Sequence, residues 1–385
     1  MRRKQKPLVN LLFFAAVLFA ILFLNHSHSP EKAFAWTRIR YKSSAASLPP
    51  ARGICPGLSP AKPALVVARI HADVDPEWLN TISDRYHLCV YTADAPEDSG
   101  SVDLQVPANR GHEAMAFLTF IIDNYDTIPA AGAVFVHGSR FSWHNDSPDY
   151  DNLALLQSLN ISAALAPVGY HNLRCDWSAS TCEQSKAPPQ GSLETSFRAV
   201  LQPYDPRVIS DSALPRSLAV LFGGDAPEAA TTGGEVFLGR GDAVRSQCCA
   251  QFVVARENIR RHTRDEYIAL RQWLLDGAPS HLNPRQRTLN KNAAPRDDRV
   301  AGRIVSYLWH ILFIQQTVSA DQGRDASTID LQQLNHLACP RADDCYCRLY
   351  GRCNLPGCGT PGRCAGQYRI PPDFKLPADW AASHA

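Results

Sequence analysis

One stretch of the sequence concentrates the residue types that bind metals and polar ligands. It begins with an apolar run, Ala133-Val134-Phe135-Val136, which breaks off into His137-Gly138-Ser139. This pattern is typical of a buried strand that opens into a loop. The loop carries two histidines, a tryptophan, an amide and a carboxylate, namely His137, Trp143, His144, Asn145 and Asp146. Since chemistry in α/β folds gathers beyond the carboxyl ends of strands, this loop is the first candidate for a functional site.

The two histidines and the aspartate of this loop predict a metal site. Imidazole and carboxylate ligands suit divalent metals such as Mn or Zn. We therefore take His137, His144 and Asp146 as candidate ligands of a divalent metal such as Mn, and Asp146 also as a candidate catalytic residue. The alternative is a surface loop whose histidines only form local hydrogen bonds.

Candidate site residues also lie outside this loop. Glu113 and Glu257 each stand near the start of an expected helix and are candidate catalytic bases. Either glutamate has a simpler explanation, because a carboxylate in the first turn stabilises the helix dipole. The candidate substrate-binding residues are Trp143, Arg110, Gln251 and Arg256.

The elements around these residues alternate between strand and helix patterns. Residues 65–70 and 88–92 are expected to be strands, and residues 102–106 a third. From residue 114 to 125, apolar side chains recur at spacings of three and four, which predicts a helix before the strand at 133–136. Residues 265–275 form a second amphipathic pattern, and residues 302–313 are apolar enough to be buried. The sequence therefore predicts an α/β fold, a mixed sheet flanked by helices that resembles the GT-A glycosyltransferase layout.

The amino end predicts a membrane anchor. Arg2, Arg3, Lys4 and Lys6 precede an apolar run at 8–24, which favours an uncleaved signal anchor with the basic end in the cytoplasm. We expect a cytoplasmic tail at 1–7, the anchor at 8–24, a flexible stem at 25–63, a lumenal α/β domain at 64–335 and a cysteine-rich tail at 336–385 packed on that domain. Such a chain is a single-pass type II membrane protein of the Golgi or endomembrane lumen.

Twelve cysteines agree with an oxidising compartment. Cys175 and Cys182 are close enough in sequence to predict a local disulfide. Six further cysteines crowd the tail, where three disulfides are favoured over zinc because the spacing lacks a zinc-knuckle pattern. These six are Cys339, Cys345, Cys347, Cys353, Cys358 and Cys364. Three short glycosylation sequons begin at Asn25, Asn145 and Asn160. A formal net charge of +2 makes nucleic acid a poor partner.

Several motifs in fixed order resemble a fungal family called domain of unknown function 3431. They include Val66-Val67-Ala68-Arg69, Val134-Phe135-Val136-His137-Gly138, Cys249-Ala250-Gln251-Phe252, Tyr307-Leu308-Trp309-His310 and the Cys-Tyr-Cys of the tail. The resemblance covers residues 65 to about 380 and implies architecture and compartment, with no assigned activity. Family members tend to carry a glutamate before Tyr-Leu-Trp-His, and Ser306 stands there in this chain. The resemblance therefore allows for a weakened or inactive member.

Three functions fit these patterns. The first is a lumenal glycosyltransferase-like protein that transfers a sugar from a nucleotide sugar to a glycan or protein acceptor. In GT-A enzymes an Asp-x-Asp motif binds the metal, but His137-Gly138-Ser139 occupies its place here, and Asp149-Tyr150-Asp151 is a literal match nearby. The second function is a non-catalytic lumenal binding or scaffolding protein. The third is a metal-dependent hydrolase that uses the His, His, Asp cluster with Glu113 or Glu257 as base.

Overall fold

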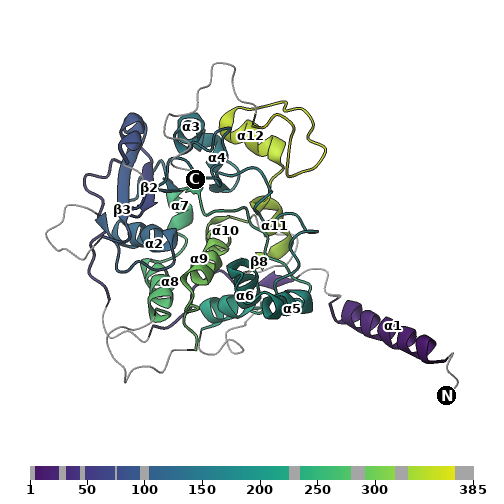
Figure 1. Ribbon diagram of the computed structural model, residues 1–385. Coiled ribbons are helices and arrows are strands. Elements are labelled where there is room, and N and C mark those ends of the chain that lie inside the picture. Colours follow the sequence, from purple (N-terminus) through teal and green to yellow (C-terminus); the bar gives the residue numbers. More distant parts are fainter. Residues whose placement is uncertain are drawn as a thin grey trace.

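A six-stranded sheet forms the centre of the protein. The computed structural model describes residues 5–25, 32–43, 48–73, 76–95, 104–224, 235–278, 291–316 and 328–368. The strands lie in the order β4-β3-β2-β5-β7-β6. β3 and β2 lie side by side at the left of Figure 1. Their bounds are β2 Ala64–Arg69, β3 His87–Thr92, β4 Leu104–Gln105, β5 Ala133–His137, β6 Tyr170–Asn172 and β7 Phe252–Val254. Of the strand expected at 102–106, residues 102 and 103 lie outside the described part.

The order of the strands creates a switch point beside β5. The chain runs outward through β2, β3 and β4, which pair in parallel. It then returns and places β5 parallel to β2 on the other side. β7 is antiparallel to both β5 and β6, so the sheet is mixed. The connections that follow β2 and β5 therefore leave in opposite directions. Open α/β sheets hold their ligands at such a switch point.

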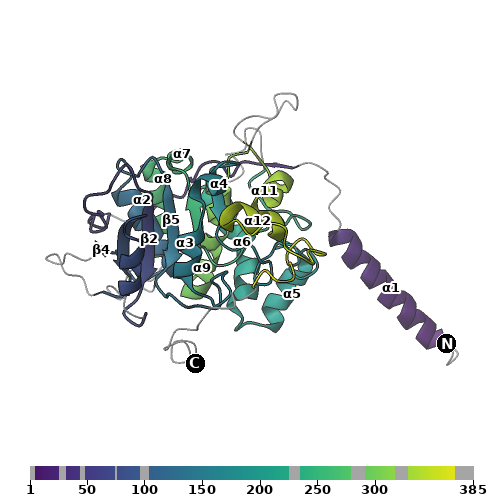
Figure 2. The same ribbon diagram turned by 90° about the horizontal axis from the view of Figure 1, so that it is seen from above.

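Helices cover both faces of the sheet because strand side chains alternate between two apolar clusters. Val66, Phe135 and Phe252 belong to one cluster, and Leu65 and Val134 belong to the other. The helices of the first cluster are α2 Glu113–Asp123, α6 Pro206–Gly223, α8 Arg264–Asp276, α9 Asp298–Ser306 and α10 Leu308–Phe313. The helices of the second cluster are the 3-10 helix Pro76–Ile82, α3 Asn152–Ser158, α4 Ile161–Leu165 and α12 Ala342–Tyr350. In Figure 2, α3, α4 and α12 lie near one another. The mixed sheet flanked by helices is confirmed, whereas the specific GT-A likeness stays a prediction.

The region from 178 to 241 contains more structure than its composition suggests. α5 Leu193–Leu201 begins at the N-cap Ser192, and α6 begins at the N-cap Asp205 with a proline in its first turn. The remaining short elements are α7 Arg256–Ile259, α11 Leu331–Ala338 and a two-stranded sheet of β1 Ala33–Phe34 with β8 Ile329–Asp330.

The amino end differs from the expected layout. α1, Gln5–Asn25, lies away from the body (Figure 1). No helix within the part of the chain that the structure describes is long and apolar enough to span a bilayer. The expected flexible stem at 25–63 is wrong over much of its length. Phe34 and Trp36 are fully buried in the body, and Cys55 is bonded to Cys89 of β3.

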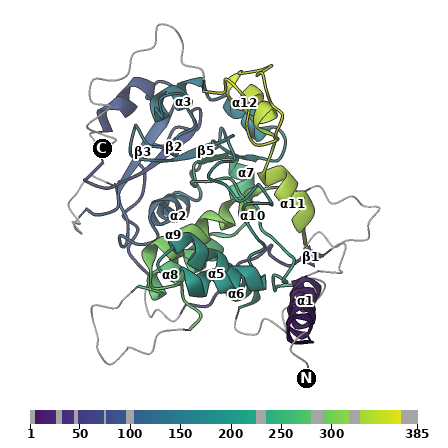
Figure 3. The same ribbon diagram turned by 45° about the vertical axis from the view of Figure 1, so that its right-hand side comes forward.

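The disulfides join distant parts of the chain. The expected Cys175–Cys182 bond is wrong, because Cys175 pairs with Cys345 and Cys182 with Cys339. Within the tail, the bonds are Cys347–Cys353 and Cys358–Cys364. The tail is thus disulfide-bonded, as expected, but two of its cysteines hold it to the body. α12 also buries apolar side chains in the second core, so the described part of the tail is a layer of the fold (Figure 3). Residues 369–385 of the expected tail lie outside the described part.

Candidate functional site

The carboxyl ends of β2, β3 and β5 meet at one edge of the sheet, as the parallel register requires. His71 and Asp94 lie there as a pair. The backbone amide of His71 donates to Asp94, and its ring Nδ1 is 2.9 Å from Asp94 Oδ1. Burial acts to raise the pKa of Asp94, but the hydrogen bonds from His71 lower it overall. In the neutral form of the exposed ring, an ionised Asp94 favours the tautomer with the proton on Nδ1, and Nε2 is then the proton acceptor.

A second pair at this edge joins the loops after β2 and β5. Ser139 Oγ donates to Asp73 Oδ1 at 2.5 Å, and the Ile70 amide donates to the other oxygen of the same carboxylate. Gly138 lies so close to Arg69 that an added Cβ would meet the arginine Cβ at 2.4 Å. The glycine at this position therefore lets the two loops approach each other closely.

His137 and His144 come together, as the sequence analysis expected. Their ring centroids are 4.5 Å apart. Nδ1 of His144 lies 2.9 Å from Ser142 Oγ, while its Nε2 is shielded from solvent without a partner among the described residues. Burial and the nearby His137 and Arg174 lower the pKa of His144 to about 3. His144 is therefore neutral at physiological pH and supplies no positive charge to an anionic ligand.

A bond between adjacent cysteines closes one side of this histidine pair. Cys248 is bonded to Cys249, and the carbonyl of Cys249 lies 2.7 Å from His137 Nε2. Cys249 and Ala250 both have positive φ, at 84° and 47°, so the chain turns sharply before β7. The hydrogen bond between His137 Nε2 and the Cys249 carbonyl fixes the orientation of the His137 ring.

Asp146, expected to be catalytic and a metal ligand, is an internal anchor. Its carboxylate is 2% exposed. One oxygen accepts the amides of Cys175 and Asp176, at 2.6 and 3.1 Å. The other accepts the hydroxyls of Tyr346 and Tyr368, at 2.8 and 2.5 Å. Burial and this carboxylate both raise the pKa of each tyrosine, so the phenols stay protonated and donate.

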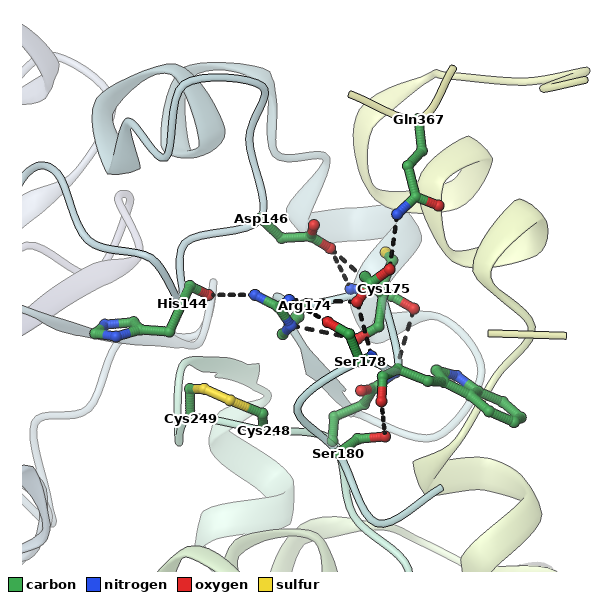
Figure 4. Close-up of polar contacts among 12 residues, drawn as sticks. His144, Asp146, Arg174, Cys175, Ser178, Ser180, Cys248, Cys249 and Gln367 are labelled. Atoms are coloured by element: carbon green, nitrogen blue, oxygen red, sulfur yellow. Dashed lines mark hydrogen bonds and ion pairs between the residues drawn. A yellow bond between two sulfur atoms is a disulfide. The ribbon is translucent and has the colours of Figure 1, made fainter. Parts of the chain in front are cut away.

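A polar network continues from Asp146 along the loop after β6 (Figure 4). Arg174 donates to the His144 carbonyl at 2.9 Å and pairs with Asp176 at 3.3 Å. Gln367 donates to Asp176 from the tail at 2.8 Å. Burial acts to lower the pKa of Arg174, but the nearby carboxylates of Asp146 and Asp176 raise it overall. The network joins the loop after β5, the loop after β6 and the tail into one unit.

Gln251, a candidate substrate-binding residue, is 3% exposed and holds two loops together. Its Nε2 donates to Asn145 Oδ1 at 2.9 Å. Its Oε1 accepts the amide of His137 at 3.3 Å and the side chain of Asn152 at 3.1 Å. All three hydrogen bonds of the Gln251 side chain are made to other residues of the protein. Gln251 therefore has a positioning role.

Trp143 and Arg110, two further candidate substrate-binding residues, have opposite environments. Trp143 is 54% exposed and packs edge-on against His144, so its indole is accessible to a ligand. Arg110 is 4% exposed; it pairs with Asp298 and donates to backbone carbonyls around the end of α8. Arg110 therefore braces α8 and α9.

The register of β7 separates Glu257 and Arg256 from the histidine pair. Because β7 is antiparallel to β5, Val254 lies opposite Ala133, at the start of β5. Glu257 follows Val254 and thus lies at the opposite edge of the sheet from His137. Exposed Glu257 pairs with Arg256 at 3.1 Å. Glu113 begins α2 in a partly buried position, which its role in the first turn explains.

The expected metal trio does not assemble. Among described residues, only Cys55, His87 and Cys89 bring three potential ligand atoms within 4.8 Å of one another, and both sulfurs are in a disulfide. The oxygens of Asp146 already accept four hydrogen bonds, so His137, His144 and Asp146 do not fit a metal. Nor do Asp149 and Asp151 form a metal motif. Asp151 caps α3 and pairs with Arg140, and Asp149 accepts from Ser147.

A cavity of about 730 Å³ lies beyond the end of β6. His137 and His144 are not among the residues that line it. Among the residues that line it are Trp177, Gln184, Arg245, Gln332, Asn335 and His336. The lining also includes the charged side chains Lys32, Asp242 and Asp330.

Sequence reasoning missed the pair of His71 and Asp94. Both residues follow expected strands, and parallel pairing of those strands would have brought their ends together. It also missed Tyr346 and Tyr368, whose hydroxyls bind Asp146 across 200 and 222 residues of sequence. No local pattern marks such long-range partners.

The fold and this edge define a disulfide-braced α/β protein with polar side chains at the switch point of a mixed sheet. The sequence matches, over residues 65–348, the family described as "Protein of unknown function (DUF3431)". The match spans most of the chain, and the protein belongs to this family. Neither the curated proteins nor the solved structures contain a match to it.

Proposed function

We propose that the protein binds a nucleotide sugar at the carboxyl edge of β2, β3 and β5 and transfers its sugar to a hydroxyl acceptor. The observation that supports this proposal is the switch point between β2 and β5, with polar side chains gathered around it. Open α/β sheets bind nucleotides at such switch points, beyond the carboxyl ends of the strands. The exposed indole of Trp143 offers a flat surface for a base or a sugar ring.

His71 is the residue that we assign as the base. Asp94 holds its Nδ1 proton and orients the ring, and Nε2 then accepts the proton of the attacking hydroxyl. The bond from acceptor oxygen to sugar forms as the bond from sugar to the diphosphate breaks, and the nucleoside diphosphate leaves.

One observation favours a second candidate, a binding protein without transferase activity. Of the three carboxylates expected to be catalytic, Asp146 is fully hydrogen-bonded and Glu257 lies at the far edge. Such a protein would bind the nucleotide sugar at the same edge but release it unchanged. The hydrolase alternative loses its basis, because the trio that was to hold its metal does not assemble.

The test uses the full chain and a panel of nucleotide sugars, with thermal shift and product analysis as separate measurements. We expect one sugar nucleotide to raise the melting temperature and to be consumed when an acceptor is present. Trp143→Ala should weaken binding by about tenfold, which corresponds to the loss of one stacking contact of about 1.4 kcal/mol. His71→Ala should bind normally but lower the transfer rate by roughly 100-fold or more, because it loses the base.

The matched control is Glu257→Ala, an exposed carboxylate at the opposite edge, which should change neither measurement. Binding without product supports the second candidate. If no nucleotide sugar binds, or if Glu257→Ala reduces binding as much as Trp143→Ala, this edge is not the site.

A further inference from the structure

α5 presents its apolar side chains outward. Among the described residues of α5, only Thr195 is buried. Phe197, Val200 and Leu201 are 67%, 77% and 75% exposed, and Tyr204 in the following turn is 93% exposed. A helix that only covers a core shows the reverse arrangement.

Three of these side chains share one side of α5, because Val200 and Leu201 follow Phe197 at spacings of three and four residues. Tyr204 follows in the turn after the helix. We call Phe197, Val200, Leu201 and Tyr204 the α5 stripe. Large apolar side chains grouped on a surface mark a binding site for a protein or a membrane, whereas single ones do not.

α5 lies on the side of the body from which α1 extends (Figure 1). Close contacts connect the start of α5 to the start of the body. A Cβ on Gly191 would meet the carbonyl oxygen of Gly239 at 2.5 Å. The Gly239 amide donates to Asp242, and Lys32 pairs with the same carboxylate at 3.0 Å. Figures 1, 2 and 3 agree, since α5 and α6 lie on the side of the body towards α1 in each view.

The connection from α1 to this part of the body is short. α1 ends at Asn25, seven residues before Lys32. Seven residues reach at most about 25 Å, so α5 cannot lie far from the carboxyl end of α1. The described side chains of α1 are the other large group of exposed apolar residues, including Leu11, Phe13, Phe14 and Phe19 at 62% exposure or more.

We infer that the α5 stripe docks on the surface of a lipid bilayer that also takes up α1. An amphipathic helix lies in the plane of the membrane with its apolar side among the acyl chains, and aromatic rings favour the headgroup level. Phe197 and Tyr204 at the ends of the stripe have this character. The short tether keeps α5 close to the membrane when the exposed apolar side chains of α1 are bound there. The inference is independent of the proposed function.

The experiment places the full chain in phosphatidylcholine vesicles that contain an apolar diazirine dissolved in the bilayer. After photolysis and digestion, mass spectrometry locates the label. We expect label on α1 and on the peptide that carries the α5 stripe. The peptide containing Ile54, which is 59% exposed on the body, is the control for reaction through water and should remain unlabelled.

In the double variant Phe197→Ser with Leu201→Ser, the amount of label on α5 should fall at least several-fold. The amount of label on α1 should stay the same. Its melting temperature should stay within a few degrees, because both side chains are exposed. Ile54→Ser is the matched variant and should leave the α5 label unchanged. Label on α1 without label on α5 overturns the inference, and so does the absence of label from both. Cross-linking between two copies of α5 would assign the stripe to a second copy of the chain instead.

Discussion

Asp146 shows how a residue type that suits catalysis can serve architecture. A free carboxylate in a loop can bind a metal or accept a proton, but here all four contacts are made by the protein itself. The partners are two amides of the loop after β6 and two tyrosine hydroxyls of the tail region. A buried charge satisfied in this way is strongly coupled to the fold, because removing it leaves donors without acceptors.

We therefore predict that Asp146→Ala lowers the free energy of unfolding by about 3 kcal/mol or more, from unpaired buried donors. Urea denaturation without reductant measures this change. Asp343→Ala, which removes a partly exposed carboxylate paired with Arg341, should change it by less than about 1 kcal/mol. A stable Asp146→Ala protein that has lost ligand binding would instead return Asp146 to the functional site.

At the scale of elements, the disulfides decide how the carboxyl-terminal helices meet the sheet. Cys175 and Cys182 lie in the loop after β6, and their partners flank or lie within α12. α12 then packs on α3 and α4 and completes the second core. The bonds at 347–353 and 358–364 close only short turns.

Peptide mapping under non-reducing conditions should therefore find Cys175 linked to Cys345 and Cys182 linked to Cys339. A link between Cys175 and Cys182 would contradict the arrangement. The chain-entropy relation predicts that removing the bond across 157 residues costs about 5 kcal/mol, against about 2 kcal/mol for a bond across six. The double variants Cys182→Ser with Cys339→Ser, and Cys358→Ser with Cys364→Ser, provide this comparison by urea denaturation.

At the scale of the whole molecule, we propose a membrane-attached protein whose body lies in an oxidising lumen of the Golgi or endomembrane system. The proposal is supported by the six disulfides, which an oxidising compartment sustains, and by the exposed apolar side chains of α1. The basic residues that precede α1 favour a cytoplasmic amino end.

A tag at the carboxyl end should accordingly resist protease in sealed microsomes and become sensitive when detergent is added. A tag at the amino end is the matched control and should be cut in both conditions. Cleavage of the carboxyl-terminal tag without detergent would place the body in the cytoplasm and contradict the proposal.

The sequence by itself determined the local elements and the chemical character of the chain. Apolar runs of strand length and helical periodicity predicted β2, β3, β5, α2 and α8, because burial of one face imposes these periods directly on the residues. The same reasoning predicted that His137 and His144 lie near each other, since seven residues of one loop separate them. The density of cysteines predicted a disulfide-bonded tail.

Only the tertiary structure decided which of these parts face one another. The antiparallel direction of β7 brings Gln251 to the edge that carries His137 and sends Glu257 to the other edge. Cys175 pairs across 170 residues instead of seven, and Asp146 finds its tyrosines across 200 and 222. Such choices depend on strand direction and on the packing of whole layers. No window of neighbouring residues contains that information, because the competing arrangements share the same local patterns and differ only in their long-range contacts.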